Sequence, residues 1–203
     1  MTEPKILELT PQWIAVDKPS GWLTVRPTNP SPVPILSDWV QTQHPDAKIC
    51  HRLDVQTTGA VIFARGPQNH RIANEWFTSH RIKKIYHCIC AGIPEMPVMK
   101  LDAAVRGSPA TTQVQVKERF GGGTPSFLAE ARIVTGRRHQ IRIHLAGDGH
   151  PLLGDTQYGG SAVVPRVALH SFSIEFPNGE RFTSPWPEDF RCWIDSLRAN
   201  LPL

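Results

Sequence analysis

The stretch HRLDVQTTGAVIFAR, residues 51–65, joins a polar loop to an apolar run. Residues 60–65 (AVIFAR) have the length and composition of a buried strand. The Thr-Thr-Gly before them predicts a turn whose hydroxyls hold the loop shape. Asp54 therefore lies in a loop that leads into a rigid strand, where active-site groups are often found. An isolated Asp near Thr and Gly also suits a turn cap, and the stretch alone leaves both interpretations open.

Outside this stretch, hydrophobic periodicity predicts more strands than helices. The expected strands are 13–16, 60–65, 85–92, 111–118, 127–134 and 169–176, and the expected helices are 35–43, 67–79 and 139–146. In the second helix, Ile72, Trp76 and Phe77 are expected to face the core, and residues 26–34 and 121–126 are expected to be loops. The pattern predicts an α+β fold with a mixed, largely antiparallel sheet and flanking helices. At this length we expect a single domain over residues 1–203.

Composition narrows the class of protein. No apolar run approaches the roughly 20 residues that a membrane-spanning helix needs. The N-terminal sequence MTEPKILELT lacks the basic and apolar regions of a signal peptide, so we expect a cytoplasmic protein without a membrane partner. The four cysteines form no C-x-x-C pair, which supports neither a zinc ribbon nor a thioredoxin-like motif and predicts free thiols.

Positive charge is concentrated in two segments. The net charge is only +4, yet residues 65–84 hold five Lys or Arg against one acid, and residues 132–142 hold four Arg and no acid. Such clusters suit a polyanion, because each cation near a phosphate releases condensed counterions. Two ordinary solvated faces would give the same counts, so charge alone leaves the partner open.

A second polar constellation, TGRRHQIRIHLAGDGHPLLGD, occupies residues 135–155. On a helix that starts at His139, Arg142 would point to much the same side as His139. Gly136, Arg137 and Arg138 precede this helix, and a helix N-terminus is a natural phosphate site. A basic surface helix is the alternative for this segment.

Together these motifs resemble those of the RluA-type family of pseudouridine synthases. That family carries H-R-L-D-x-x-T-S-G, then K-x-Y, T-G-R-x-H-Q-I-R-x-H-L and G-H-P-[IL]-x-G-D. The chain reads HRLDVQTTG at 51–59, KIY at 84–86, TGRRHQIRIHL at 135–145, GHPLLGD at 149–155, KPSG at 18–21 and ALH at 168–170. The matches keep the family's order over residues 13–187, and Thr58 retains the hydroxyl where Ser is usual.

The resemblance implies the pseudouridine synthase catalytic fold and a role for each matching residue. Asp54 matches the catalytic aspartate, Tyr86 the tyrosine that packs on the target base, and Arg142 the arginine that pairs with the aspartate. Arg52 resembles the arginine that enters the RNA, and Leu169 a wall of the pocket. The expected RNA-binding residues are Arg52, Lys84, Arg137, Arg138, His139 and Leu169. Some members of the family carry a separate S4-like RNA-binding domain, and we expect none here because the first expected strand begins close to the start of the sequence.

These residue types suit an RNA isomerase. A carboxylate can act as nucleophile or base, and the sequence does not choose between attack on the sugar and attack on the base. An acid among apolar groups tends to protonate, so a cation is needed to keep Asp54 charged. The target uridine must leave the stack and meet an aromatic surface. We expect a monomer without cofactor that acts on a stem-loop of ribosomal or transfer RNA.

Two alternatives come from other classes of protein. The first is a phosphodiesterase-like metal site, whose conceivable ligands are His51, Asp54, His139, His144, His150, Asp155 and His170. No H-E-x-x-H or similarly compact ligand motif supports it. The second is an inactive RNA-binding module of the same fold, which loss of the aspartate, tyrosine or arginine would favour. The target RNA and uridine are not predicted by the sequence.

Overall fold

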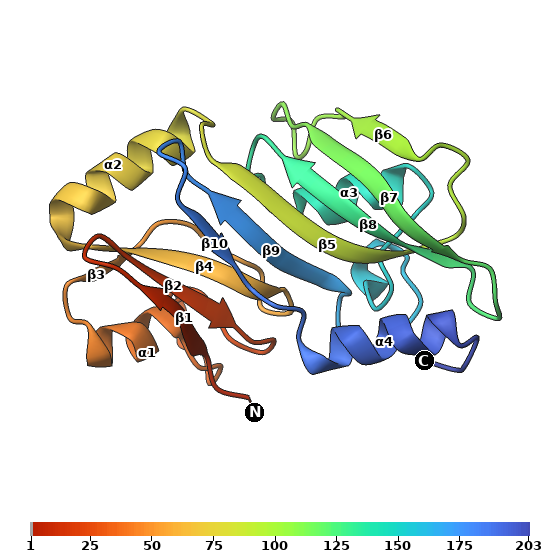
Figure 1. The fold of residues 1–203 in the computed structure, drawn as a ribbon, viewed down its shortest axis with the longest axis horizontal. Helices are drawn as coiled ribbons and strands as arrows, with labels where there is room; N and C mark the ends of the chain where they lie inside the picture. The colour runs from red at the N-terminus through yellow and green to blue at the C-terminus, as the bar shows by residue number, and fades with distance from the viewer. Residues whose placement is uncertain (1) are drawn as a thin grey trace. The chain divides into compact units, whose positions relative to one another are not determined.

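The computed structural model describes residues 2–203, which form two compact units (Figure 1). Unit 1 contains the chain up to Lys83 together with Ser171–Pro185. Unit 2 contains Lys84–His170 and Trp186–Leu203. The chain therefore passes from one unit to the other three times, and neither unit is a continuous segment. The prediction of a single domain stays a prediction.

Unit 1 is built on a group of strands in which most pairs are antiparallel. Its elements are β1 (Lys5–Leu9), β2 (Trp13–Lys18), α1 (Leu36–Gln43), β3 (Ala47–Ile49), β4 (Thr58–Arg65), α2 (Gly66–Thr78), most of β9 (Leu169–Glu175) and β10 (Arg181–Thr183). The strand order is β1-β2-β4-β9, with β3 on β4 and β10 on β9. Strand β4 lies between β2 and β9, and all its residues except Arg65 are buried. Because residues on both faces of β4 are buried, its sequence is continuously apolar instead of alternating.

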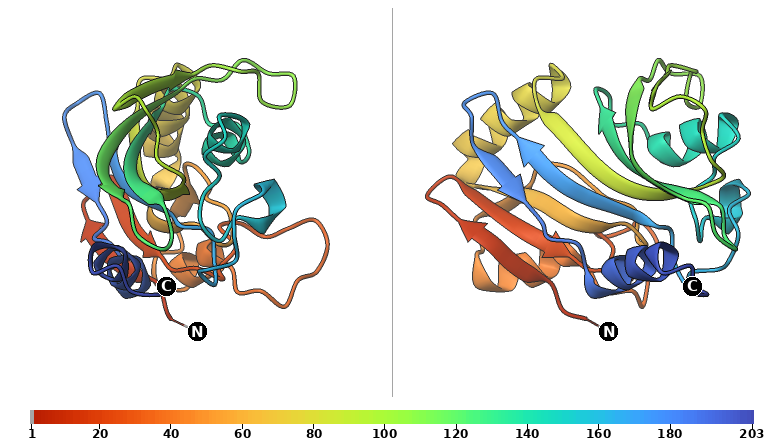
Figure 2. Two further views of the ribbon diagram at one scale, coloured as in Figure 1. Left: turned by 90° about the vertical axis from the view of Figure 1, so that its right-hand side faces the viewer. Right: turned by 45° about the vertical axis from the view of Figure 1, so that its right-hand side comes forward.

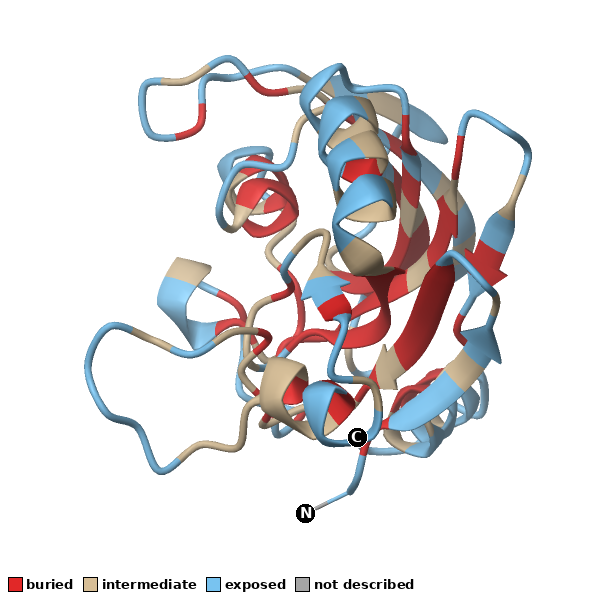
Figure 3. Cartoon of the chain, turned by 90° about the vertical axis from the view of Figure 1, so that its left-hand side faces the viewer, coloured by how far each residue is buried: buried red, intermediate tan, exposed pale blue. Residues whose placement is uncertain are grey.

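The core of unit 1 is rich in aromatic rings. Trp13 packs edge-on against Phe176 with ring centroids 4.8 Å apart, and Trp76 of α2 lies 5.2 Å from the same Phe176 ring. Trp76 and Phe77 are partly buried against this core, as predicted, but the fully buried residue of α2 is Ala73 and not Ile72. Along the outer face of α2 the residues are exposed (Figure 3). The small Ala73 side chain lets the helix approach the strands closely.

Unit 2 contains a second antiparallel group of strands. Its elements are most of β5 (Lys83–Ala91), β6 (Val98–Leu101), β7 (Thr112–Phe120), β8 (Ser126–Ile133), α3 (Gln140–Gly147), the 3-10 turn η1 (Thr156–Tyr158) and α4 (Glu188–Arg198). The strand order is β5-β8-β7-β6, and all three pairs are antiparallel. Figure 2 shows α3 beside β7, where His144 shares a 2.8 Å hydrogen bond with Thr112. The helix is thereby fixed to the start of this strand.

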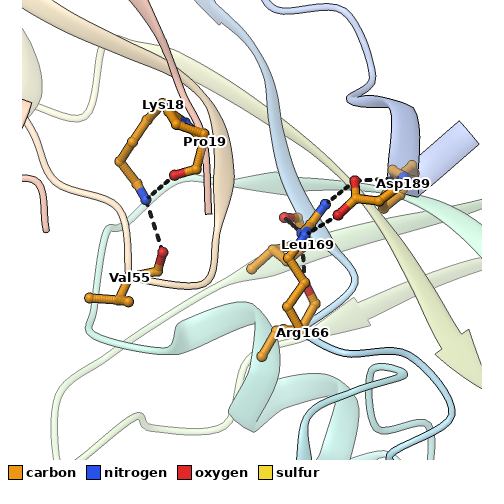
Figure 4. A network of polar contacts seen from close by, with 8 residues as sticks. Lys18, Pro19, Val55, Arg166, Leu169 and Asp189 are labelled. Atoms are coloured by element: carbon orange, nitrogen blue, oxygen red, sulfur yellow. Dashed lines mark hydrogen bonds and ion pairs between the residues drawn. The ribbon is translucent and has the colours of Figure 1, made fainter. Parts of the chain in front are cut away.

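Helix α4 packs on unit 2 through one apolar face. Phe190, Trp193, Ile194 and Leu197 recur at helical spacing and are buried. Two polar contacts hold the helix start: Arg166 forms a bidentate ion pair with Asp189 at 2.7 and 2.8 Å (Figure 4), and Trp186 Nε1 donates to His87 Nδ1 at 2.7 Å. Burial, followed by the charges of His170 and Lys117, lowers the pKa of His87 to about 4. His87 therefore stays a neutral acceptor at physiological pH.

The predicted α+β fold with a largely antiparallel sheet is confirmed. All six predicted strands and three predicted helices are present, with ends shifted by up to two residues. The loops at 26–34 and 121–126 are also loops in the structure, except that Ser126 begins β8. The prediction missed β1, β3, β6, β10 and α4. Among residues 2–203, no helix has both the length and the apolar character needed to cross a bilayer.

Candidate active site

The loop between β3 and β4 carries Asp54 in unit 1. The hydroxyl of Thr24 holds this loop twice, because Thr24 Oγ1 accepts from the backbone N–H of Leu53 at 3.0 Å and donates to its carbonyl at 2.8 Å. On the other side, the Thr57 N–H donates to the Asp54 carbonyl at 3.1 Å. Leu53 is buried, Asp54 is half-buried and Arg52 is exposed. The backbone on either side of Asp54 is thus fixed from within unit 1.

A buried lysine supports the same loop. The side chain of Lys18 is fully buried, and its Nζ donates to the carbonyls of Pro19 and Val55, both at 3.1 Å (Figure 4). It also donates to the carbonyl of Trp22 at 2.9 Å. These three carbonyls satisfy an ammonium group that would otherwise be costly to bury. The Gly21 N–H adds a 3.0 Å bond to the Val55 carbonyl. The KPSG element at 18–21 therefore braces the Asp54 loop, a role that sequence reasoning missed although it singled out the element.

The first and last residues of HRLDVQTTG are structural. His51 Nε2 accepts from the Ile62 N–H of β4 at 3.0 Å, and the imidazole stacks on Phe77 with centroids 5.1 Å apart. Gly59 has a φ of +110°, and an added Cβ would lie 2.3 Å from the Ser171 carbonyl oxygen. Only glycine fits both this conformation and this close approach.

In unit 2, the Arg142 guanidinium is buried against Asp155. Arg142 Nε and Nη2 donate to the two carboxylate oxygens of Asp155 at 2.6 and 2.7 Å, and Nη2 also reaches Gln157 Oε1 at 3.1 Å. Both side chains are nearly inaccessible, at 8% and 1% exposure. The guanidinium carbon lies 5.0 Å from the centre of the Tyr158 ring. Sequence reasoning identified Arg142 but assigned no role to Asp155 in this pairing and missed Tyr158.

Lys84 and Tyr86 are both buried in β5. Lys84 Nζ donates to the carbonyls of Val134 and Thr135 at 3.5 and 3.3 Å, and burial lowers its pKa to about 8. Its ammonium therefore holds the backbone ahead of the basic loop, and its predicted phosphate contact stays a prediction. Leu169, the predicted pocket wall, is buried at the start of β9.

The basic loop before α3 is exposed and ordered by Gln140. Gln140 Oε1 accepts from Thr135 Oγ1 at 2.6 Å and from the Arg137 N–H at 3.1 Å, while its amide donates to the Thr111 carbonyl at 2.9 Å. Arg137 and Arg138 are exposed. Helix α3 itself buries five of its eight residues, Arg142 among them. The basic character is thus presented by the loop, and the alternative of a basic surface helix is wrong.

Several candidate metal ligands have other partners. His144 is bonded through Nδ1 to Thr112 Oγ1 and through Nε2 to the Ala103 carbonyl, both at 2.8 Å. His150 Nδ1 contacts the Ala91 carbonyl at 3.0 Å. Asp155 is held by Arg142. Across residues 2–203, no group of three His, Cys, Asp or Glu side chains is arranged to hold a metal ion.

The predicted residues are distributed over both units. Asp54 and Arg52 belong to unit 1, whereas Tyr86, Arg142, Leu169 and the loop with Arg137, Arg138 and His139 belong to unit 2. Within unit 2, Tyr158 contacts both Arg142 and His139 and so links these two predicted residues. The predicted pairing of Arg142 with Asp54 joins residues of different units and stays a prediction.

Residues 12–147 match the family model described as RNA pseudouridylate synthase. The chain belongs to the RNA pseudouridylate synthase family. The ribosomal large subunit pseudouridine synthase D of Nitrosomonas europaea is 33% identical, over 98% of this chain and 66% of that protein. The dual-specificity RNA pseudouridine synthase RluA of Vibrio vulnificus is 29% identical, over 80% of this chain and 73% of that protein.

These relatives place this pseudouridylate synthase in the RluA-type group. The chain spans about two thirds of the length of the curated relatives that it matches. Among solved structures, human RNA pseudouridylate synthase domain containing 4 has a TM-score of 0.79 at 21% identity, covering 95% of this chain and 92% of that one. Human RNA pseudouridylate synthase domain containing 1 has a TM-score of 0.73, also at 21% identity, covering 99% and 97%. Both confirm the predicted fold.

Proposed function

We propose that the chain converts specific uridines of RNA to pseudouridine, with Asp54 as nucleophile or base. The observation that carries the proposal is the HRLD segment: in a member of this family, it presents a half-buried carboxylate on a loop held by Thr24 and Lys18. A carboxylate that reacts must be held in a fixed position, and a rigid loop provides this.

The reaction needs no outside oxidant or reductant. The N1–C1′ bond of uridine breaks, the uracil turns, and a C5–C1′ bond forms. C5 then gives up its proton, and N1 gains one from solvent. Asp54 divides the reaction into two steps either by attack on the sugar or base or by accepting a proton. We assign no cofactor to it.

The other residues bind and orient the RNA in this proposal. The target base leaves the stack and packs on Tyr86, because a base inside a helix cannot be reached. Arg142 keeps the carboxylate charged, Arg52 fills the space that the base vacates, and Leu169 forms an apolar wall. Phosphates are bound by Arg137, Arg138, His139 and Lys84. We propose ribosomal or transfer RNA as the substrate, and the names of several relatives, which mention the ribosomal large subunit, support the first. We also propose that the enzyme is monomeric and acts in the cytoplasm.

The test is Asp54→Asn. The variant is expected to lose pseudouridine formation by at least about 1000-fold, because it removes the reacting oxygen charge while keeping size and phosphate contacts. Tritium release from RNA that carries 5-tritiated uridine measures the reaction, and filter binding measures RNA affinity, which should change by less than about 2-fold. The matched control is Asp46→Asn, an exposed carboxylate of the same unit, which should retain full activity.

Appreciable turnover by Asp54→Asn would remove Asp54 from its proposed role. RNA from cells that lack this protein provides the substrate for a second assay. If the wild-type protein binds this RNA but releases no tritium from it, the result would favour the inactive binding module. Mass-spectrometric mapping of pseudouridine in RNA from cells with and without the gene identifies the target uridine. No difference between the two RNA pools would contradict the proposed activity.

A further inference from the structure

Asp155 is a buried carboxylate to which the proposed mechanism assigns no task. Its side chain is 1% exposed and accepts two bonds from Arg142, in the parallel geometry that makes arginine–carboxylate pairs strong and directional. Such a pair fixes the plane of the guanidinium as well as its position. Whatever Arg142 contacts is therefore met in an orientation that Asp155 sets.

The loop that carries Asp155 is itself rigid. The Asp155 carbonyl accepts from the N–H groups of Tyr158 and Gly160 at 3.1 and 2.8 Å, and its own N–H donates to the Leu152 carbonyl at 3.2 Å. Gly154 and Gly160 allow close backbone approach, because an added Cβ at either would lie 2.0 Å from a carbonyl oxygen. The residues from Gly154 to Gly160 thus form a preorganised holder for the carboxylate.

Tyr158, at the end of η1, completes the surroundings of Arg142. The guanidinium carbon lies 5.0 Å from its ring centre, within the range of a cation–π interaction. The phenol is fixed in turn, because Tyr158 Oη and His139 Nδ1 are 2.9 Å apart. His139 has a φ of +60° at the start of α3, and its ring meets the Tyr158 ring edge-on. Asp155 thus accepts hydrogen bonds from the edge of the guanidinium, and the Tyr158 ring covers its face.

We infer that Asp155 is a positioning residue for Arg142 and that the Tyr158 ring is the surface on which the guanidinium is held. The inference rests on the proposed function. An ion pair that only stabilises the fold affects the stability of the protein and not its kcat. A pair that positions Arg142 affects kcat, and it does so only while the Arg142 side chain is present. Unit 2 offers a comparison, because Arg166 and Asp189 form a second bidentate pair (Figure 4). The guanidinium carbon of Arg166 lies 4.9 Å from the centre of the Trp193 ring.

The first experiment compares Asp155→Asn with Asp189→Asn, each assayed below its own unfolding temperature. Asp155→Asn is expected to lower kcat roughly 10- to 100-fold with KM for RNA changed less than about 3-fold, since misplacing a reacting group can cost up to about 100-fold. Asp189→Asn loses thermal stability but keeps kcat within about 2-fold. Asp155→Asn is then repeated in an Arg142→Ala background, where it should have no further effect on kcat.

The second experiment keeps Asp155 and changes the aromatic face. Tyr158→Phe retains the ring and is expected to keep kcat within about 3-fold, whereas Tyr158→Leu removes it and lowers kcat roughly 5- to 30-fold, the equivalent of a desolvated cation–π contact. Tyr158 is half-buried, so neither change should prevent folding. Equal activity of the Phe and Leu variants would remove Tyr158 from the inference.

An active wild-type protein whose kcat is unaffected by Asp155→Asn would overturn the inference and leave the proposed function standing. The inference would also be overturned if Asp155→Asn lowered kcat equally in the Arg142→Ala background. The same holds if Asp189→Asn lowered kcat as much as Asp155→Asn does. Absence of turnover by the wild-type protein would overturn the proposed function, and the positioning role with it. The two failures are therefore distinguishable in one set of assays.

Discussion

Burial of Lys84 gives a single residue a measurable effect on pH dependence. Its pKa is lowered to about 8 from an ordinary value of 10.5 because the ammonium is desolvated. Below pH 8 the amine is charged in both folded and unfolded chains, and the full cost of burying the charge is present. Between pH 8 and 10.5 the unfolded chain binds more protons than the folded one, so the folded state gains stability as pH rises.

The prediction compares wild-type protein with Lys84→Met in urea unfolding at pH 7, 9 and 10.5. The stability of the wild type relative to the variant should rise across this range, by at most about 3 kcal/mol for a shift of this size. Parallel stability curves would show that Lys84 is not desolvated as described.

At the residue scale, sequence motifs predicted which residues to examine better than what each one contacts. Asp54 and Arg142 were singled out, and their proposed roles stay predictions. The brace from Lys18 to Val55 spans 37 positions and the Arg142–Asp155 pair spans 13, and such distant partners are set by tertiary folding. Residue types in a motif do not reveal that Lys84 is turned toward backbone carbonyls.

At the scale of elements, the junction of the HRLD loop with β4 depends on one glycine. Gly59→Ala should destabilise the protein by about 2–6 kcal/mol, because the left-handed backbone strain and the clash with the Ser171 carbonyl add together. The matched control is Gly66→Ala at the start of α2, where φ is +74° but no atom lies within 4 Å of the added Cβ.

Only backbone strain acts at Gly66, so its substitution should cost about 1–2 kcal/mol. Urea unfolding followed by circular dichroism measures both values. Losses of equal size would mean that the close approach of β9 to Gly59 contributes nothing.

Long elements were predictable because their periodicity extends over many residues. Strand β4 and helix α2 have apolar patterns that determine their type without tertiary information. The missed strands β3, β6 and β10 have three or four residues, too few to show a period. Helix α4 is different, because its apolar spacing and the acidic residues of its first turn were visible in the sequence.

At the scale of the whole molecule, charge should govern the affinity for RNA. Each neutralised phosphate contributes about 0.7 to the slope of log affinity against log salt concentration for a single strand. Changing both Arg137 and Arg138 to Gln should therefore reduce the magnitude of the slope by about 1.4. Arg198→Gln is the control, because this exposed arginine is already paired with Glu118 at 2.8 Å. Filter binding from 50 to 300 mM salt measures the slope, and an unchanged slope in the double variant would place the RNA elsewhere.

The division of the chain between the two units also has a consequence during synthesis on the ribosome. Strands β2 and β4 emerge early, but β9, the other neighbour of β4, follows only after all of residues 84–168. Until then β3 pairs only with residues 63–65 on that side of β4, and the rest of this apolar edge is a site for pairing with other chains. At roughly 5–20 residues per second this interval lasts on the order of 5–20 s. Translation rate and chaperone supply should therefore affect the yield of this protein more than its modest length suggests.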